Sequence, residues 1–191
     1  MTRLSIMLGA LLILLSSSVV LVVAPYFAYV WPEAQGRNHE LSEVQQRGRE
    51  VYISMGCVYC HSQQPRNPGY GPDTARGWGY QPSAQDYAGQ YPHQLGTSRT
   101  GPDLYNIGDR NPSIQWNLIH LYDPRLVVPW SIMPSFRFLF TEKDQPGPED
   151  VVLDLKNIGV HPPRHVVATQ DALALMAYLK SLQQKELPAH E

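Results

Sequence analysis

Cysteine is scarce in this 191-residue sequence, which contains only two. A structural zinc site usually needs a second cysteine pair or suitably spaced histidines, and no second pair exists here. The sequence also lacks an excess of basic residues, because 15 Lys and Arg stand against 17 Asp and Glu, for a net charge of −2. It has no basic run and no internal repeat, so the composition argues against a protein that binds nucleic acid.

Charged side chains are absent from residues 4–31. Residues 4–24 (LSIMLGALLILLSSSVVLVVA) are largely apolar, and about 20 such residues suffice for a helix to cross the hydrocarbon core of a bilayer. A cleaved signal peptide would have a shorter apolar stretch, and Pro25 is a poor context for cleavage. We therefore predict a transmembrane anchor over residues 1–32, followed by one soluble domain over residues 33–191.

Both cysteines lie in the pentapeptide Cys57-Val58-Tyr59-Cys60-His61, which is typical of covalent c-type haem attachment. In such a site each thiol adds across one vinyl group of the haem, and the following histidine reaches the iron. We interpret His61 as the proximal ligand. The competing interpretations are a thioredoxin-like redox pair, which would need an α/β pattern that the sequence does not show, and a disulfide across two residues, which is rare.

The covalent haem also predicts on which side of the membrane the domain lies. In bacteria, c-type haem is attached outside the cytoplasmic membrane. The positive-inside argument is weak, because Arg3 is the only charged side chain before the apolar stretch. We therefore expect a single-pass protein of the bacterial inner membrane, with its soluble domain on the periplasmic side.

The soluble part is predicted to be mainly α-helical with long loops. Helices are expected at about 40–55, 113–121 and 169–184, where apolar residues recur at helical spacing. Ser42 and Gln45 have the spacing of a capping box at the start of the first helix. Proline (17) and glycine (14) gather in the middle of the chain, which indicates a domain wrapped around something other than its own side chains.

A haem iron held by His61 needs a sixth ligand or has an open position, and methionine and histidine are the usual ligands. Three methionines follow the anchor. Met55 is too close to Cys57 to reach over the ring, and Met176 lies at a helical spacing typical of a core residue. Met133, in a segment rich in proline, is the favoured ligand, and His120 is the main rival.

Three segments carry a resemblance to a known family: GREVYISMGCVYCHSQ, RTGPDL and HLYDPRLVVPWSIMP. Together with the single anchor, they resemble the membrane-anchored monohaem cytochrome c subunit (subunit II) of cbb3-type haem-copper oxidases. The resemblance runs from about residue 48 to residue 182. It implies a class I-like cytochrome c fold, in which the helix with Gly48 and Tyr52 crosses the last helix near Tyr178.

The resemblance also implies roles for individual residues. Pro102 would present its carbonyl to His61 Nδ1, Leu104 would pack on the haem edge, and Met133 matches the distal ligand of the family. Arg99 and Arg125 are candidates to meet the haem propionates, since arginine pairs well with carboxylates. The alternative for each arginine is a surface cation with a chance acidic partner.

The function implied is transfer of single electrons from a donor cytochrome c to a membrane-embedded haem-copper catalytic subunit that reduces oxygen, with no bond-making chemistry in this chain. Residues 64–80 (QPRNPGYGPDTARGWGY), residues 92–96 and Trp130 depart from the common pattern. These departures leave open the same role in a nitric oxide reductase or a cytochrome subunit of a periplasmic dehydrogenase. A third possibility is a sensor cytochrome whose iron binds a gas. Aromatic residues of the middle loop would pack on a partner subunit or cover the haem: Tyr70, Trp78, Tyr80, Tyr87 and Tyr91.

Overall fold

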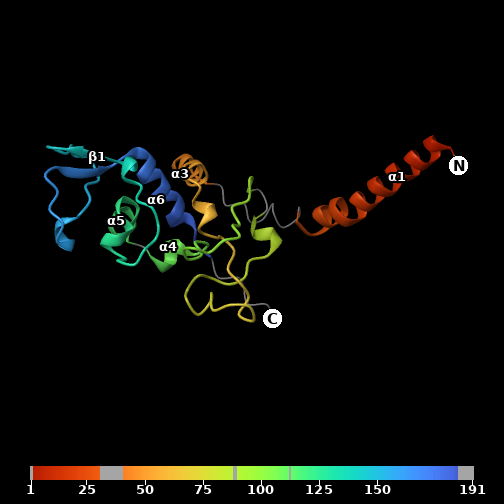
Figure 1. The fold of residues 1–191 in the computed structure, drawn as a ribbon, viewed down its shortest axis with the longest axis horizontal. Coiled ribbons are helices and arrows are strands. Elements are labelled where there is room, and N and C mark those ends of the chain that lie inside the picture. Colours follow the sequence, from red (N-terminus) through yellow and green to blue (C-terminus); the bar gives the residue numbers. More distant parts are fainter. Residues whose placement is uncertain (1, 31–40, 88–89, 112, 185–191) are drawn as a thin grey trace. The chain divides into compact units, whose positions relative to one another are not determined.

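The structure, a computed structural model, describes residues 2–30, 41–87, 90–111 and 113–184 (Figure 1). The chain forms two compact units, one of residues 1–40 with 82–93 and the other of residues 41–81 with 94–191. The predicted boundary between residues 32 and 33 lies outside the described residues.

The first unit contains the long apolar helix. Helix α1 spans Arg3–Ser18 and continues through π-helical turns at Val19–Val23 and Tyr26–Val30. The continuous helix Arg3–Ala28 has 26 residues, enough in length and apolar character to cross a membrane. Its apolar side chains are not buried against the protein. A helix that exposes so much apolar surface fits the predicted single-pass membrane anchor.

The second unit contains the three helices that the sequence predicted. They are α3 (Glu43–Ser54), α5 (Ile114–Tyr122) and α6 (Gln170–Ser181). A fourth short helix, α4 (Ile107–Arg110), was not predicted. With the apolar helix α1, this content confirms a mainly α-helical fold. Short 3-10 turns of this unit occur at Cys57–Tyr59, Pro124–Leu126, Arg137–Leu139 and Lys156–Ile158, and the first unit has one at Ala84–Tyr87.

Side-chain caps explain where these helices begin. Ser42 and Gln45 form the predicted capping box, in which the Ser42 hydroxyl accepts from Gln45 N and the Gln45 side chain accepts from Ser42 N. Ser113 caps α5 and Thr169 caps α6 in the same way, through their hydroxyl oxygens.

Helices α3 and α6 pack closely at a glycine. A Cβ atom built on Gly48 would lie 1.9 Å from the carbonyl oxygen of Ala174, so only glycine permits this approach. The rings of Tyr52 and Tyr178 meet edge to face at the same crossing, with centroids 5.5 Å apart. This is the crossing that the family resemblance implied, and Figure 1 shows the two helices side by side.

A small antiparallel sheet lies between α5 and α6 in the sequence. Strand β1 (Phe140–Lys143) pairs with β2 (His165–Ala168), with Phe140 opposite Ala168. The sheet packs into the same core as the helices. The core cluster is built from residues of the second unit: Val51, Tyr52, Leu104, Ile107, Leu118, Ile119, Leu121, Leu139, Phe140, Leu153, Leu155, Val166, Ala168, Ala172, Leu175, Met176 and Tyr178. Met176 is thus a core residue, as predicted.

Candidate haem site

The pentapeptide Cys57–His61, the candidate haem-binding peptide, is separated from the end of helix α3 by two residues. Gly56 adopts a left-handed conformation (φ 70°), which stops the helix and turns the chain. Residues Cys57–Tyr59 form a 3-10 turn, and His61 N donates to the Cys57 carbonyl at 2.9 Å. The thiols of Cys57 and Cys60 are not joined in a disulfide. Two free thiols therefore flank one turn whose next residue is a histidine.

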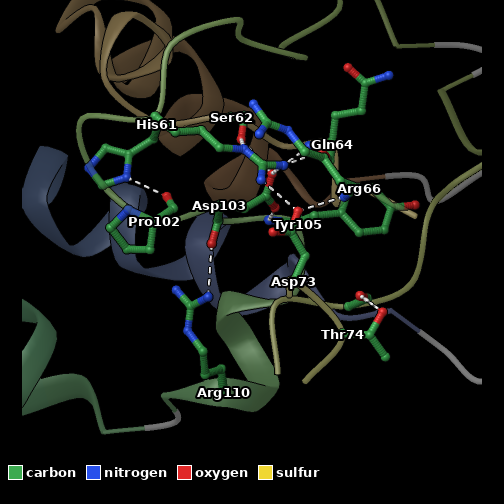
Figure 2. A network of polar contacts seen from close by, with 12 residues as sticks. His61, Ser62, Gln64, Arg66, Asp73, Thr74, Pro102, Asp103, Tyr105 and Arg110 are labelled. Carbon is green, nitrogen blue, oxygen red and sulfur yellow. Dashed lines mark hydrogen bonds and ion pairs between the residues drawn. The ribbon is translucent and has the colours of Figure 1, made fainter. Parts of the chain in front are cut away.

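The imidazole of His61 is held by one specific contact. Its Nδ1 lies 2.8 Å from the carbonyl oxygen of Pro102, the partner that the resemblance implied (Figure 2). A carbonyl can only accept, so Nδ1 carries the proton and Nε2 keeps its lone pair. Burial lowers the pKa of His61, which favours the neutral ring that a metal ion requires. The histidine is thus oriented as a ligand through Nε2.

Gly101 provides the space in which the imidazole lies. A Cβ atom at this position would be 2.3 Å from His61 Cε1 and 2.8 Å from its Nδ1. Real Cβ atoms do not approach other atoms so closely, so a side chain here would push the ring away. The glycine of RTGPDL is therefore required by its contact with the ring.

These residues fit a covalent haem better than an ordinary metal ion. Among the residues that the structure describes, no group of three or more His, Cys, Asp or Glu could hold a metal ion. The zinc alternative therefore finds no ligand set within the described part of the chain. Two free thiols and a neutral histidine with a fixed tautomer are, in contrast, what attachment of a c-type haem uses.

A buried ionic network begins at Ser62, the residue that follows His61 (Figure 2). The side chains of Asp103, Asp73 and Arg99 are 0%, 2% and 13% exposed. Arg99 pairs with Asp73 at 2.6 Å and with Asp103 at 3.3 Å, and its Nη2 also donates to the Gln64 carbonyl at 2.6 Å. Most of the guanidinium donors of Arg99 are therefore committed to protein acceptors.

The aromatic residue Trp78 lies at the edge of this network. The guanidinium carbons of Arg76, Arg99 and Arg110 lie 5.1, 5.7 and 5.8 Å from its ring centroid. Gln184, which follows helix α6, holds the loop that contains Trp78: its side chain accepts from Tyr80 N and donates to the Tyr80 carbonyl. Trp78 and Tyr80, in the loop rich in proline and glycine, are therefore held by other residues of the second unit.

The segment with Met133 is held by side chains on both sides. Arg125 Nη1 donates to the Met133 carbonyl at 3.2 Å, and Arg125 Nη2 donates to Ser135 Oγ at 2.7 Å. Met133 N donates to Ser131 Oγ at 3.2 Å. Arg125 also pairs with Asp123 at 3.1 Å. Met133 itself is half-buried and packs against the core cluster, so the structure supplies a fixed backbone for this methionine.

His120, the rival ligand, lies on α5 and stacks on Trp116 with ring centroids 4.8 Å apart. Its Nδ1 is buried and finds no hydrogen-bond partner among the described residues. A core histidine that binds no metal would be expected to hydrogen-bond to a backbone carbonyl, and the structure shows no such bond at Nδ1. Burial lowers the pKa of His120 to about 4, so the ring is neutral at physiological pH.

The other residues singled out from the sequence are placed as follows. Leu104 is buried in the core cluster. Arg99 belongs to the ionic network and Arg125 to the Met133 segment, and contact of either with a propionate stays a prediction. The sequence did not single out Asp73 or Asp103, whereas Trp78 was expected only as an aromatic residue that covers the haem or packs on a partner. The one available signal was the pairing of Arg99 and Asp103 four positions apart within RTGPDL.

The apolar helix, the mainly helical second unit and the free thiols beside His61 fit the class of membrane-anchored c-type cytochromes. The chain matches the family described as cytochrome c oxidase, mono-heme subunit/FixO, over residues 2–165, and it belongs to that family. A search of curated proteins found no match. Membership makes this chain an electron-transfer subunit of a membrane-bound oxidase complex, which also contains a catalytic subunit.

Proposed function

We propose that this chain carries one haem c, bound through Cys57 and Cys60, with His61 as proximal and Met133 as distal ligand. It receives single electrons from a donor cytochrome c on the periplasmic side and passes them to the haem-copper subunit that reduces oxygen. The observation that carries the proposal is the His61 Nδ1 contact with the Pro102 carbonyl at 2.8 Å, beside two free thiols. When bound, the haem supplies a one-electron couple.

The hydrogen bonds around the two candidate side chains favour Met133 over His120 as the distal ligand. A histidine that binds a metal through Nε2 normally donates Nδ1–H to an acceptor, as His61 does. His120 has no such acceptor among the described residues, so ligation would leave a buried N–H without a partner. Met133 has no such requirement, and its backbone is held by Arg125 and Ser131.

The ligand assignment is tested by replacing the methionine with a residue of similar volume. Met133→Leu should lose the low-spin six-coordinate spectrum and should bind carbon monoxide, while the haem stays covalently attached through both thioethers. Met176→Leu is the matched control, because Met176 is a core residue, and it should keep the wild-type spectrum. A low-spin spectrum in Met133→Leu that is unchanged by carbon monoxide would show that another residue binds the iron.

The partner is tested by mild extraction of the membrane complex. We expect a haem-copper subunit to copurify with this chain, and the complex to consume oxygen with a reduced cytochrome c as donor. Turnover of nitric oxide without oxygen consumption would assign the chain to a reductase instead. Copurification with a periplasmic dehydrogenase would also overturn the proposed acceptor. Ready binding of carbon monoxide by the wild-type chain would favour the sensor alternative.

A further inference from the structure

The ionic network is joined to the proximal histidine through one residue. Pro102 accepts the hydrogen bond from His61 Nδ1, and the next residue, Asp103, has a fully buried side chain. The orientation of the Pro102 carbonyl therefore depends on how the backbone at Asp103 is held. Backbone hydrogen bonds flank this point, from Gly101 N to the Cys60 carbonyl at 2.9 Å and from Leu104 N to the Ser62 carbonyl at 2.8 Å.

The carboxylate of Asp103 fastens the two segments together. Its Oδ2 accepts from Ser62 Oγ at 2.6 Å and from Gln64 N at 2.8 Å, both in the segment that follows His61. Its Oδ1 accepts from Tyr105 N at 2.8 Å, in its own segment. One buried carboxylate thus holds the backbone on both sides of the contact between His61 and Pro102 (Figure 2).

Arg99 completes this arrangement and balances part of its charge. Its Nε donates to Ser62 Oγ at 2.8 Å, so the Ser62 hydroxyl lies between Arg99 and Asp103. Asp73 accepts from Arg99 and from Arg66 N, and no hydrogen bond of its carboxylate reaches residues 57–62 in the described structure. The two buried aspartates therefore have different positions relative to His61.

We propose that Asp103 and Ser62 are positioning residues that hold the Pro102 carbonyl against His61 and thereby set the reduction potential of the haem iron. An imidazole that donates a firm hydrogen bond from Nδ1 is a stronger electron donor to the metal, and this stabilises the ferric state. Loosening the contact should therefore raise the potential. The inference rests on the proposed function, because it requires a haem bound to His61.

Three variants of the full chain with its haem separate positioning from charge. Ser62→Ala removes a hydrogen bond to Asp103 without changing any charge. Asp103→Asn removes a charge and replaces one of the two accepting oxygens by an NH2 donor. Asp73→Asn removes a similar buried charge whose carboxylate makes no hydrogen bond to residues 57–62 in the described structure. The measurements are the midpoint potential and the exchange rate of the His61 Nδ1 proton by NMR.

We expect Ser62→Ala and Asp103→Asn to raise the midpoint potential. Both should also speed exchange of the His61 Nδ1 proton about tenfold, which is the change expected for the loss of about one net hydrogen bond. Asp73→Asn should leave that exchange rate at the wild-type value. Wild-type potential and exchange in Ser62→Ala would overturn the inference, as would equal exchange rates in Asp73→Asn and Ser62→Ala. If Asp103→Asn does not fold, Ser62→Ala decides. Failure of the proposed function would be distinct, because the wild-type chain would then lack covalent haem or ligation by His61.

Discussion

The His61 imidazole has room beside it because Gly101 carries a hydrogen atom in place of a side chain. In Gly101→Ala the new methyl group would lie 2.3 Å from His61 Cε1, so the ring or the backbone must move. We expect a loss of about 1–3 kcal/mol in the free energy of unfolding, together with loss of the low-spin spectrum. Urea unfolding and absorption spectroscopy measure the two effects.

A second glycine in the same unit provides the control for this change. At Gly71 an added Cβ would meet no atom closer than 3.5 Å, which is an ordinary contact. Gly71→Ala should therefore keep both the spectrum and the stability of the wild type. Equal behaviour of the two variants would show that the Gly101 hydrogen does not define the position of the imidazole.

His120 should make the stability depend on pH. Its pKa is lowered by burial from 6.5 to about 4, whereas the unfolded chain keeps the ordinary value. Between these values the unfolded state binds a proton that the folded state does not, so the free energy of unfolding falls as the pH falls. The slope from this one group is at most about 1.4 kcal/mol per pH unit, and less because the ring is partly exposed.

Urea unfolding at pH values above 6.5 and near 4 measures this dependence. His120→Gln should flatten the pH dependence in this window, while His161→Gln, at an exposed histidine, should leave it unchanged. An identical slope in the wild type and in His120→Gln would mean that other groups cause the acid sensitivity.

The cysteines and the histidine of the candidate site could be predicted from the sequence, whereas the buried ion pairs beside them could not. The spacing of Cys57, Cys60 and His61 is local, so it can be read directly along the chain. The pairing of Asp73 with Arg99 depends on the folding of a long loop. Nothing local distinguishes Asp73 from the other acidic residues of the sequence, because burial is a property of the folded chain. For Asp103 the only local signal was its position four residues after Arg99.

Among the elements, the crossing of α3 and α6 is the contact most sensitive to added volume. The helix propensity of alanine is about 1 kcal/mol more favourable than that of glycine, so Gly48→Ala would stabilise an isolated α3. In the folded protein, however, the new Cβ would lie 1.9 Å from the Ala174 carbonyl oxygen and 2.8 Å from Tyr178 Cβ. The clash involves backbone, so we expect a net destabilisation of at least about 2 kcal/mol.

Thermal unfolding of the haem-loaded chain measures this effect, with Gly147→Ala as the control. At Gly147 the nearest atom to an added Cβ is 3.6 Å away. The control should unfold at the wild-type temperature. A Gly48→Ala variant at least as stable as the wild type would show that the two helices can separate without loss.

Helices α3, α5 and α6 could be predicted because the residues that cap their N-termini lie next to them in the sequence. Ser42, Ser113 and Thr169 each cap the helix that follows. The β1–β2 pair could not be predicted in this way. Each strand has only four residues, and more than 20 residues separate them, so neither a tight turn nor a clear alternation marks the pair. Helix α4 is too short for a periodic pattern.

For the whole molecule, a prediction about truncation follows because no residue of the helix Arg3–Ala28 belongs to the core cluster. The core cluster lies entirely between residues 51 and 178. A variant without residues 1–40, exported with a cleavable signal, should still attach haem and should unfold at nearly the wild-type temperature. It should appear in the soluble fraction, whereas the full chain should stay with the membrane after an alkaline wash, because a membrane-spanning helix inserts almost irreversibly.

Fractionation followed by haem staining checks this prediction. A truncated chain that is made but carries no haem would show that residues 1–40 contribute to folding of the second unit. Release of the full chain by the alkaline wash would contradict the membrane-spanning interpretation of Arg3–Ala28.

The contact between α3 and α6 joins early and late parts of the chain. Arg47 on α3 bonds to Asp171 on α6, 124 positions later. Because a chain is made and exported from its N-terminal part onward, α3 and the pentapeptide 57–61 cross the membrane before α6 is present to pack against α3. During this interval the two sulfur atoms are accessible to whatever installs the cofactor. The order of the elements along the chain thus gives maturation a period in which to act before the protein closes.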